Sequence, residues 1–289
     1  MRLALGTVQF GLPYGVANQV GQVARAEAKA MLELAAGSGI DTLDTAVGYG
    51  DSEVCLGEAG VSNFKIVTKL PSVPAGCPDI KAWVHEQISA SMGRLGVDEL
   101  YGVLLHRSEN LLGGDGELLY RSLLQLREKG SVRKLGVSIY SPQELDAILK
   151  LFSVDLVQAP FNLIDQRLHS TGWLDRLKSN GVEVHTRSVF LQGLLLMPRA
   201  SVPSWFARWD GLWDSWHKWL SVSQVSAVQA CLAFSLAFEG IDRVVVGADG
   251  VNQLAQILSA ASEKPLRKFP DLGCGDESLI NPSHWPRFR

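Results

Sequence analysis

Eight short segments rich in Val, Leu and Ile recur along the chain, and their regular spacing constrains the fold more than any other feature. Several are almost continuously apolar, which is typical of strands buried on both faces of a parallel sheet. The segments are Leu3–Leu5, Thr42–Thr45, Ile66–Leu70, Tyr101–His106, Lys134–Ile139, Leu156–Phe161, Val182–Val189 and Arg243–Val246. The sequence therefore predicts eight strands.

Helix-like stretches separate these strands, and most end at glycine or at Asn-Gly. One begins with Ser141-Pro142, the pattern of an N-cap followed by proline in the first turn. The expected helices are Arg25–Ala36, Asp79–Leu95, Glu117–Lys129, Pro142–Leu151, Trp173–Ser179, Ser223–Phe238 and Val251–Ala261. Repeated strand–helix units joined by right-handed crossovers give a parallel sheet, and eight of them favour an α/β fold of the (β/α)8 TIM-barrel type. A doubly wound open sheet is the alternative, but no G-x-G-x-x-G follows the first strand.

Residues 1–289 are expected to form a single barrel domain, since barrels of this type often contain about 250 residues. The sequence has no internal repeat, low-complexity tract or interdomain linker. The segment after about Leu266 is expected to be loop-like.

Composition and charge exclude several classes of partner. The net charge of −3 provides no basic stripe for nucleic acid. No apolar run approaches the roughly 18 residues that span a membrane. The four cysteines form no C-x-x-C pair, and the N-terminal segment turns polar at Thr7, so we expect reduced thiols in a cytoplasmic protein without a metal site. The oligomeric state is left open.

Four chemically capable residues follow consecutive predicted strands. Asp44 ends the second strand, Tyr49 lies in the next loop, Lys69 ends the third strand and His106 ends the fourth. Taken singly, each has an ordinary structural role as a helix cap, a rim side chain, a solvated lysine or a structural hydrogen-bond partner. Barrel enzymes, however, collect catalytic groups at the carboxyl ends of their strands, so their joint placement favours an active site.

These residue types suit protonation of a carbonyl oxygen during hydride addition. Tyrosine is a weak acid with a pKa near ~10, and a neighbouring ammonium lowers that value. Lys69 is the candidate neighbour, and Asp44 is the candidate to hold it in place. His106 is positioned to donate to the same oxygen.

Eight motifs then make a family resemblance recognisable. They are LALGTVQFG, DTAVGYGDSE, VTKL, LLHR, LGVSIYS, VQAPFN, RSVFLQGLL and VVVGADGVNQL. With them the chain resembles the aldo-keto reductase family over nearly its whole length. The resemblance assigns the catalytic roles to Asp44, Tyr49, Lys69 and His106, and it implies an oxidoreductase that reduces a small aldehyde or ketone substrate.

The resemblance also implies a cofactor, NADP(H) or less often NAD(H), that lies across the barrel mouth. Ser138 and Gln158 are expected to bind the nicotinamide carboxamide, while Arg187 takes the position of the aromatic residue that stacks on that ring. The expected pyrophosphate path holds Phe190, Gln192 and Gly193, the adenosine end holds Gly247 and Ala248, and Thr7, Ser188 and Gln253 complete the set.

Two positions depart from the common family pattern. Ile139 stands where the family commonly has Asn, so one polar cofactor contact is missing or replaced. At the adenosine end Asp249 appears without a local Lys or Arg for a ribose 2′-phosphate, although Lys264, Arg267 and Lys268 follow further along the chain. We therefore expect only a modest preference for NADPH over NADH.

The substrate is expected to be a sugar or another polar aldehyde, by similarity to bacterial family members of carbohydrate metabolism. Two other functions remain open at this stage. One is a cofactor-binding sensor or interaction subunit in which turnover is incidental. The other is a Schiff-base lyase that uses Lys69, which the nearby Asp44 disfavours because it keeps the amine protonated.

Five of the eight tryptophans lie in one stretch after the seventh strand, namely Trp205, Trp209, Trp213, Trp216 and Trp219. At about 100° per residue they fall within an arc of roughly 120° on one helix. The pattern predicts one amphipathic helical insertion whose aromatic stripe packs on the barrel. Trp205 or Trp209 is expected to lie closest to the active site; a lid at the mouth and a dimer contact are the alternatives.

Overall fold

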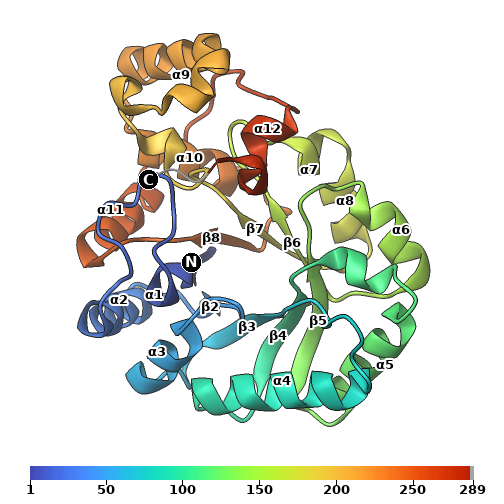
Figure 1. Cartoon of the computed structure of the whole chain (residues 1–289). Helices are drawn as coiled ribbons and strands as arrows, with labels where there is room; N and C mark the ends of the chain where they lie inside the picture. The colour runs from blue at the N-terminus through green and yellow to red at the C-terminus, as the bar shows by residue number, and fades with distance from the viewer. Residues whose placement is uncertain (287–289) are drawn as a thin grey trace.

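The strands form a closed, all-parallel barrel in sequence order, as the sequence predicts. The computed structural model describes residues 1–286. Figure 1 shows the strands at the centre with the helices around them. The strands are β1 (Leu3–Gly6), β2 (Thr42–Asp44), β3 (Lys65–Leu70), β4 (Leu100–Leu105), β5 (Val132–Ser138), β6 (Leu156–Pro160), β7 (Glu183–Arg187) and β8 (Arg243–Val246).

Strand alternation explains which side chains enter the barrel. Val67, Leu104 and Leu156, from β3, β4 and β6, form a small buried cluster separate from the main core. Residues two positions further along a strand share its face. Lys69 on β3 and Gln158 on β6 therefore point into the barrel, nearer its carboxyl-terminal mouth. The same alternation, continued beyond β4, directs His106 to this end.

The helices match most of the predicted boundaries. They are α1 (Val8–Gly11), α2 (Arg25–Gly37), α3 (Ser52–Ala59), α4 (Ile80–Leu95), α5 (Gly116–Glu128), α6 (Glu144–Leu151), α7 (Arg167–Ser170), α8 (Trp173–Ser179), α9 (Asp210–Ser223), α10 (Ala227–Leu236), α11 (Val251–Ala261) and α12 (Glu277–Ile280). The main apolar core lies between the strands and these helices.

Two predicted helix starts and one predicted loop differ from the structure. Helix α6 begins at Glu144, because this carboxylate accepts the backbone N–H groups of Tyr140 and Ser141 and holds the segment before it as a turn. Helix α10 begins after the Ser226 cap, because Gln224 has a left-handed backbone that ends α9. The segment after Leu266, expected to be a loop, contains α12.

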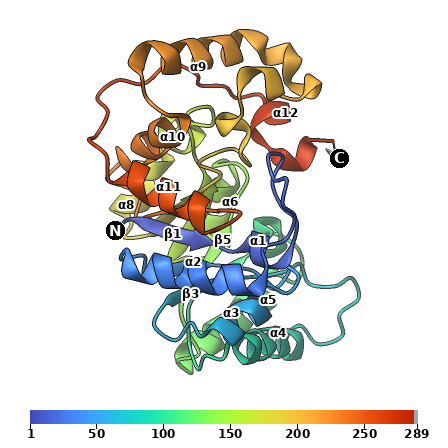
Figure 2. The ribbon, with the colours of Figure 1, turned by 90° about the vertical axis from the view of Figure 1, so that its left-hand side faces the viewer.

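The aromatic insertion is divided into two parts. Residues Ser204–Trp209 form a 3-10 helix, and α9 starts only at Asp210. Trp209 interrupts the predicted single helix because its backbone, at φ −111° and ψ 27°, lies outside the α region. Figure 2 shows α9 lying beyond α10, outside the barrel.

Two tryptophans anchor the insertion. Trp213 and Trp216 are fully buried, and their indole N–H groups donate to the backbone oxygens of Phe206 and Leu195. Trp209 and Trp219 are partly buried, whereas Trp205 is 41% exposed. The expectation that most of the stripe is buried therefore agrees with Trp213 and Trp216 at its centre, and Trp205 is the exposed member.

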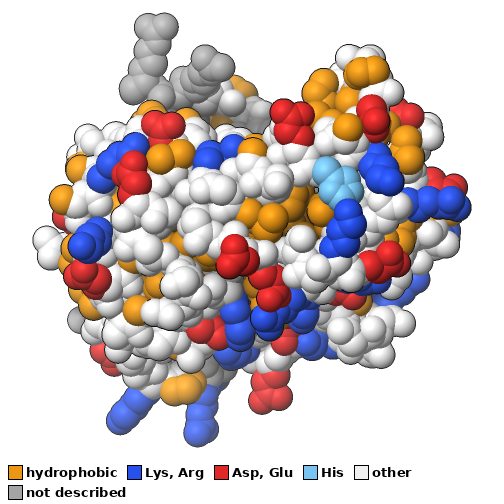
Figure 3. Space-filling model, turned by 90° about the horizontal axis from the view of Figure 1, so that it is seen from below, with side chains coloured by type: hydrophobic (Ala, Val, Ile, Leu, Met, Phe, Trp, Pro, Cys, Tyr) orange, Lys and Arg blue, Asp and Glu red, His pale blue; other side chains and the backbone are white. Residues whose placement is uncertain are grey.

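The described surface carries charges of both signs. On the face drawn in Figure 3, Lys and Arg side chains lie among Asp and Glu side chains with small hydrophobic areas between them. All four cysteines are free. Within residues 1–286 we find no cluster of three His, Cys, Asp or Glu side chains arranged to hold a metal ion. No individual described helix has the length and apolar character to cross a bilayer, and one pair, bent by 96°, passes that test jointly.

Candidate active site

The loop that carries Tyr49 is built by close backbone packing. A Cβ atom at Gly11 would lie 1.8 Å from the carbonyl oxygen of Tyr49, and one at Gly50 would lie 2.5 Å from that of Gly11. Gly50 also has a φ of +54°, which favours glycine. The Ser52 N–H donates to the Tyr49 carbonyl at 3.0 Å. Glycine at both positions therefore allows α1 and the Tyr49 loop to touch and fixes the tyrosine backbone.

Ser52 and Glu53 follow Tyr49 in the same motif and hold this loop through buried polar contacts. The Ser52 hydroxyl donates to the Thr7 carbonyl at 2.8 Å. The buried Glu53 carboxylate accepts hydrogen bonds from Thr68 and Ser91 and pairs with Arg94 at 2.7 Å. This part of the motif is thus structural, a role that the sequence analysis did not assign.

Asp44 and Lys69 form a buried ion pair. The Lys69 ammonium donates to Asp44 Oδ1 at 2.7 Å and to the Thr45 carbonyl at 2.9 Å, and its side chain is 1% exposed. The Gln158 amide donates to the other Asp44 oxygen at 2.6 Å. Both oxygens of the carboxylate are therefore fixed, one from the adjacent strand β3 and the other from β6 across the barrel, and Gln158 is a partner of Asp44 that the sequence did not reveal.

Tyr49 and His106 complete the group. The Tyr49 ring centroid lies 5.0 Å from Lys69 Nζ, and the Tyr49 and His106 rings meet edge to face with centroids 5.8 Å apart. The structure thus brings together all four residues that the sequence analysis proposed as catalytic.

Burial controls the protonation of these side chains. Burial raises the pKa of Tyr49, and the Asp44 charge adds to this rise. Burial and the Lys69 charge lower the pKa of His106 to about 4. Burial also lowers the pKa of Lys69, against the opposing effect of Asp44. At neutral pH Tyr49 is therefore a protonated phenol and His106 a neutral imidazole, so each can donate a hydrogen bond.

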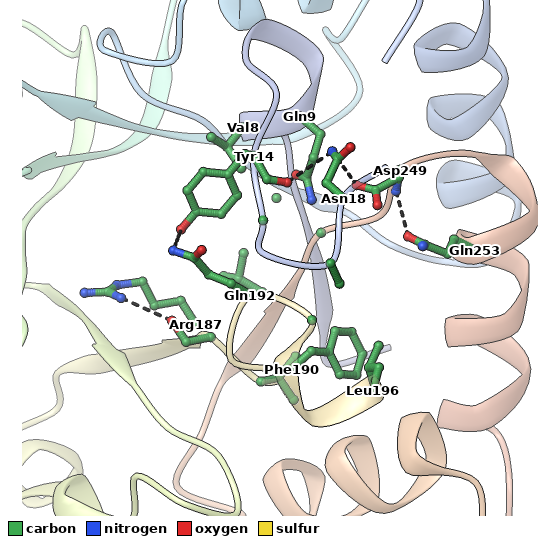
Figure 4. Close-up of a pocket in the computed structure, with 18 of the residues that line it drawn as sticks. Val8, Gln9, Tyr14, Asn18, Arg187, Phe190, Gln192, Leu196, Asp249 and Gln253 are labelled. Carbon is green, nitrogen blue, oxygen red and sulfur yellow. Dashed lines mark hydrogen bonds between the residues drawn. The ribbon is translucent and has the colours of Figure 1, made fainter. Parts of the chain in front are cut away.

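A cavity of about 460 Å³ extends from this group along the barrel mouth. Asp44 and Tyr49 line its catalytic end, and Asp249 lines it farther along. Figure 4 shows side chains from the loops after β1, β7 and β8 around it. Of the residues expected to bind a cofactor, those that line the cavity are Thr7, Arg187, Ser188, Phe190, Gln192, Gly193, Gly247 and Gln253.

Three expected cofactor residues do not line this cavity. Ser138 and Gln158 are paired neighbours on β5 and β6 and are nearly or fully buried. Ala248 is 1% exposed and does not line the cavity. Gln158 Oε1 is nevertheless a buried acceptor with no hydrogen-bond partner among the described residues. A carboxamide N–H would satisfy it, so this atom fits the group that the sequence analysis assigned to it.

The segment after β7 has an unusual backbone. Ser188, Leu191 and Gln192 have positive φ values of 64°, 48° and 54°. Such conformations cost energy in residues other than glycine and occur often at ligand-binding loops. Gly193 follows with φ +88°, and a Cβ atom there would lie 2.6 Å from the side chain of Ala17.

A loop that we call the strap, residues 12–24, crosses the cavity. The Gln192 amide donates to the Tyr14 hydroxyl at 3.1 Å, and the Asn18 amide donates to Asp249 at 3.2 Å. Figure 4 shows both contacts. The strap therefore connects the loops after β7 and β8 across the cavity. The sequence does not predict the strap, because each contact joins residues far apart in the chain.

The remaining wall comes from the start of the insertion. Leu196, Met197, Pro198 and Ser201 line the cavity, whereas Trp205 and Trp209 do not. The expectation that one of the first two tryptophans reaches the site is therefore wrong for this cavity. The chain first passes the mouth and only then turns outward to α9.

At the far end, the cavity presents an acidic residue. Asp249 lies beside Asn18 and Gln253, and burial raises the pKa of its carboxyl. Of the Lys and Arg residues in the described chain, only Arg187 lines the cavity. Lys264, Arg267 and Lys268 are exposed and lie outside its lining.

The fold and these motifs agree with comparisons to known proteins. The sequence profile of the Aldo/keto reductase family matches residues 2–268. Pyridoxal 4-dehydrogenase from Microbacterium luteolum is 26% identical over 88% of this chain and 87% of its own length. The uncharacterized oxidoreductase YqkF from Bacillus subtilis is 23% identical, and the match covers 64% of this chain and 62% of that protein.

Solved structures support the same fold. Aldo-keto reductase AKR11C1 from Bacillus halodurans, in its holo form, superposes with a TM-score of 0.73 at 21% identity, covering 92% of this chain and 88% of its own. Glycerol dehydrogenase AKR11B4 from Gluconobacter oxydans has a TM-score of 0.69 at 21% identity, covering 92% and 87%. Because the family profile covers nearly the whole chain, the chain belongs to the aldo/keto reductase family of oxidoreductases.

Proposed function

We propose that this protein reduces an aldehyde or ketone to an alcohol with NAD(P)H, and that Tyr49 is the general acid. The observation that carries the proposal is the group at the cavity end, where a protonated Tyr49 lies beside the Lys69–Asp44 pair and a neutral His106. The bound dinucleotide supplies the hydride. The chain's own residues must then orient the carbonyl and deliver a proton to its oxygen.

The geometry supports a separate catalytic role for each of the four residues. Tyr49 donates its proton to the oxygen on which negative charge develops, and the neutral His106 donates a hydrogen bond to the same oxygen. Burial and Asp44 raise the pKa of Tyr49, so the ground-state phenol is not strongly acidified. This differs from the sequence argument, in which Lys69 lowers that pKa. In the revised role Lys69 neutralises Asp44 and stabilises the phenolate as it forms.

The same contacts argue against the Schiff-base alternative. Lys69 Nζ donates to Asp44 and to the Thr45 carbonyl, and its side chain is 1% exposed. A Schiff-base lysine must be an accessible neutral amine. Lys69 is neither accessible nor free of its carboxylate.

The cavity also supports dinucleotide binding across the barrel mouth. Phe190, Gln192 and Gly193 would lie along the pyrophosphate, while Gly247 would lie near the adenosine. Ile139 stands where the family commonly has Asn. Its backbone carbonyl accepts a hydrogen bond from Arg187 at 2.9 Å.

Asp249 and the absence of Lys264, Arg267 and Lys268 from the cavity lining limit recognition of a 2′-phosphate. We expect NADPH to bind better than NADH by less than about tenfold. The family tendency to bind NADPH is opposed by the negative charge of Asp249, which repels the 2′-phosphate. Asp249→Arg should shift the ratio of dissociation constants toward NADPH. A competitive titration of both coenzymes measures this ratio, and a variant with an unchanged ratio would show that Asp249 does not face the ribose.

A small polar carbonyl compound is the substrate class that we propose. The cavity is partly polar near Tyr14, Gln192 and Arg187, and sugar-like aldehydes are small enough to enter it. The named relatives include a pyridoxal dehydrogenase and a glycerol dehydrogenase, whose names both refer to polar, hydroxylated compounds.

The test is NADPH consumption by the purified protein with a panel of short aldehydes and ketones, followed by identification of the alcohol. The proposal predicts that alcohol accumulates in equal amount to the NADPH oxidised. Tight coenzyme binding without turnover on any carbonyl compound would instead favour the sensor alternative.

A further inference from the structure

A row of buried polar side chains lies inside the barrel, on the amino-terminal side of the active site. Glu183, His185 and Arg187 are two residues apart on β7, so they share one face of this strand. Arg187 lines the cavity at the mouth, which identifies this face as the inward one. His185 therefore lies inside the barrel, where its side chain is fully buried. The proposed reaction assigns it no role.

Glu183 holds one edge of the His185 ring. The Nε2 atom of His185 lies 2.7 Å from Glu183 Oε1, while Glu183 Oε2 accepts the Tyr101 hydroxyl at 2.7 Å and pairs with Lys134. Burial opposes ionisation of Glu183, but these hydrogen bonds outweigh it and lower the pKa of the carboxyl. An ionised carboxylate can only accept hydrogen bonds. The Nε2 atom of His185 therefore carries a proton and donates it to Glu183.

The other edge of the imidazole is unpaired. His185 Nδ1 is a buried atom without a hydrogen-bond partner among residues 1–286, and within the same range Gln158 Oε1 also has none. Gln158 on β6 and His185 on β7 are direct neighbours in the register of the two strands. Both side chains face the barrel interior and are fully buried. The two unpaired atoms thus belong to adjacent side chains in one enclosed space.

The chemistry of these two atoms requires a proton donor between them. Gln158 uses its Nε2 to donate to Asp44, so its Oε1 is an acceptor. A neutral imidazole protonated at Nε2 presents a lone pair at Nδ1, which is also an acceptor. Buried polar atoms are rarely left unpaired. A buried water satisfies both atoms by donating to each, and a second proton on His185 satisfies them by donating directly to Oε1.

We propose that His185 is a positioning residue for the reaction, which holds the Gln158 carboxamide through a proton donor at Nδ1. The Gln158 amide in turn donates to Asp44 at 2.6 Å, and Asp44 pairs with Lys69 at 2.7 Å. The effect of His185 on turnover rests on the proposed reductase function, whereas the contact with Gln158 does not. Oε1 has two lone pairs, so one remains available to a coenzyme carboxamide.

The contact is tested on the coenzyme-free protein. Nitrogen-15 NMR of the His185 ring reports which ring nitrogens carry protons, and a high-resolution crystal structure locates an ordered water. We expect one of two results. A water lies within hydrogen-bond distance of both His185 Nδ1 and Gln158 Oε1, or a doubly protonated ring donates directly to Oε1. An Nδ1 atom that is bonded to another group or has no partner would overturn the proposal.

Two variants of similar size separate positioning from packing. His185→Gln places its amide at the distance of Nε2, so it can donate to Glu183 but loses the contact with Gln158. His185→Asn places its amide at the distance of Nδ1, so it keeps the contact with Gln158 and loses Glu183. Both variants remove the same titratable ring. We expect kcat to fall about three- to tenfold in His185→Gln, the effect of one hydrogen bond, and to stay within about twofold of wild type in His185→Asn.

The pH–rate profile adds a readout that a purely structural role would not change. When the Gln158 amide is held less firmly, Asp44 attracts the Lys69 ammonium more strongly. The alkaline limb should therefore move to higher pH in His185→Gln and stay in place in His185→Asn. Neither variant alters the titratable and charged groups that face Lys69, which are Tyr14, Asp44, Tyr49, His106 and Arg187.

The two variants must differ for the proposal to stand. An equal loss of kcat in both, a larger loss in His185→Asn, or an unmoved alkaline limb in His185→Gln would overturn it. If the wild-type protein reduces no carbonyl compound, the reductase function fails, and the NMR and crystallographic results still decide whether His185 holds Gln158.

Discussion

The catalytic end of the cavity and its coenzyme end lie next to each other but differ in construction. At the catalytic end, Asp44 and Lys69 are strand residues, nearly completely buried and bonded to each other. At the coenzyme end, the wall consists of loops, with three non-glycine residues in left-handed conformations and a strap held by a few side-chain contacts. The first region is suited to holding charges at fixed positions. The second is suited to admitting and releasing a large ligand.

If this comparison is right, changes in the two regions have different consequences. Substitutions at the catalytic end should lower turnover with little effect on coenzyme affinity. Substitutions in the strap should alter coenzyme release with little effect on the chemical step. The part of the aromatic insertion from Ser204 onward, which does not line the cavity, should affect stability rather than turnover or coenzyme binding.

Lys69→Met should have the largest effect on turnover. It removes the cation that neutralises Asp44 and stabilises the forming phenolate, so we expect a loss of about 10²–10⁴ in kcat. In wild type, activity should fall as rising pH removes the Lys69 proton, at a pKa that burial holds below its ordinary value. The variant should lack this alkaline limb, which a pH–rate profile measures. An unchanged limb would mean that another group is responsible.

Trp216→Ala should have the next largest effect, on folding rather than on turnover. The variant removes a fully buried indole and leaves the Leu195 carbonyl without its donor, so we expect a loss of about 3–5 kcal/mol in stability. Trp205→Ala is the control, because that side chain is 41% exposed and should cost less than about 1 kcal/mol. Denaturant midpoints compare the two. Similar losses would contradict the packing described here.

Tyr14→Phe should have a smaller effect, mainly on coenzyme binding. The variant removes the hydroxyl that accepts the Gln192 amide and so weakens one end of the strap. A neutral hydrogen bond is worth about 0.5–1.5 kcal/mol, so coenzyme dissociation should accelerate about two- to tenfold. Stopped-flow release from the complex measures this rate. A release rate equal to wild type would show that the strap contact does not hold the coenzyme.

The two regions also differ in how well the sequence predicts them. Asp44, Lys69 and His106 follow apolar strands, and parallel strands bring their carboxyl ends together, so their meeting follows from the pattern alone. The bond between Gln158 and Asp44 was missed because it spans 114 residues and depends on barrel geometry. The contact between Tyr14 and Gln192 spans 178 residues and carries no local signal.

The sequence predicts the aromatic insertion less well than the catalytic end and better than the strap. Helical spacing of the tryptophans predicts the buried face around Trp213 and Trp216 correctly. The spacing does not predict that the helix is interrupted at Trp209, because hydrophobic periodicity does not show where the backbone leaves the α conformation. The path of the chain from the mouth to α9 is fixed by tertiary packing, which the period does not encode.

The most direct test of the account is Tyr49→Phe with turnover and coenzyme affinity measured on the same preparation. The variant keeps the ring against His106 and removes only the proton donor. We predict that carbonyl reduction falls by about 10²–10⁴ while the coenzyme dissociation constant stays within about twofold of wild type. Near wild-type turnover would contradict the assignment of Tyr49 as the acid. An equal loss of coenzyme affinity would contradict the separation of the two regions.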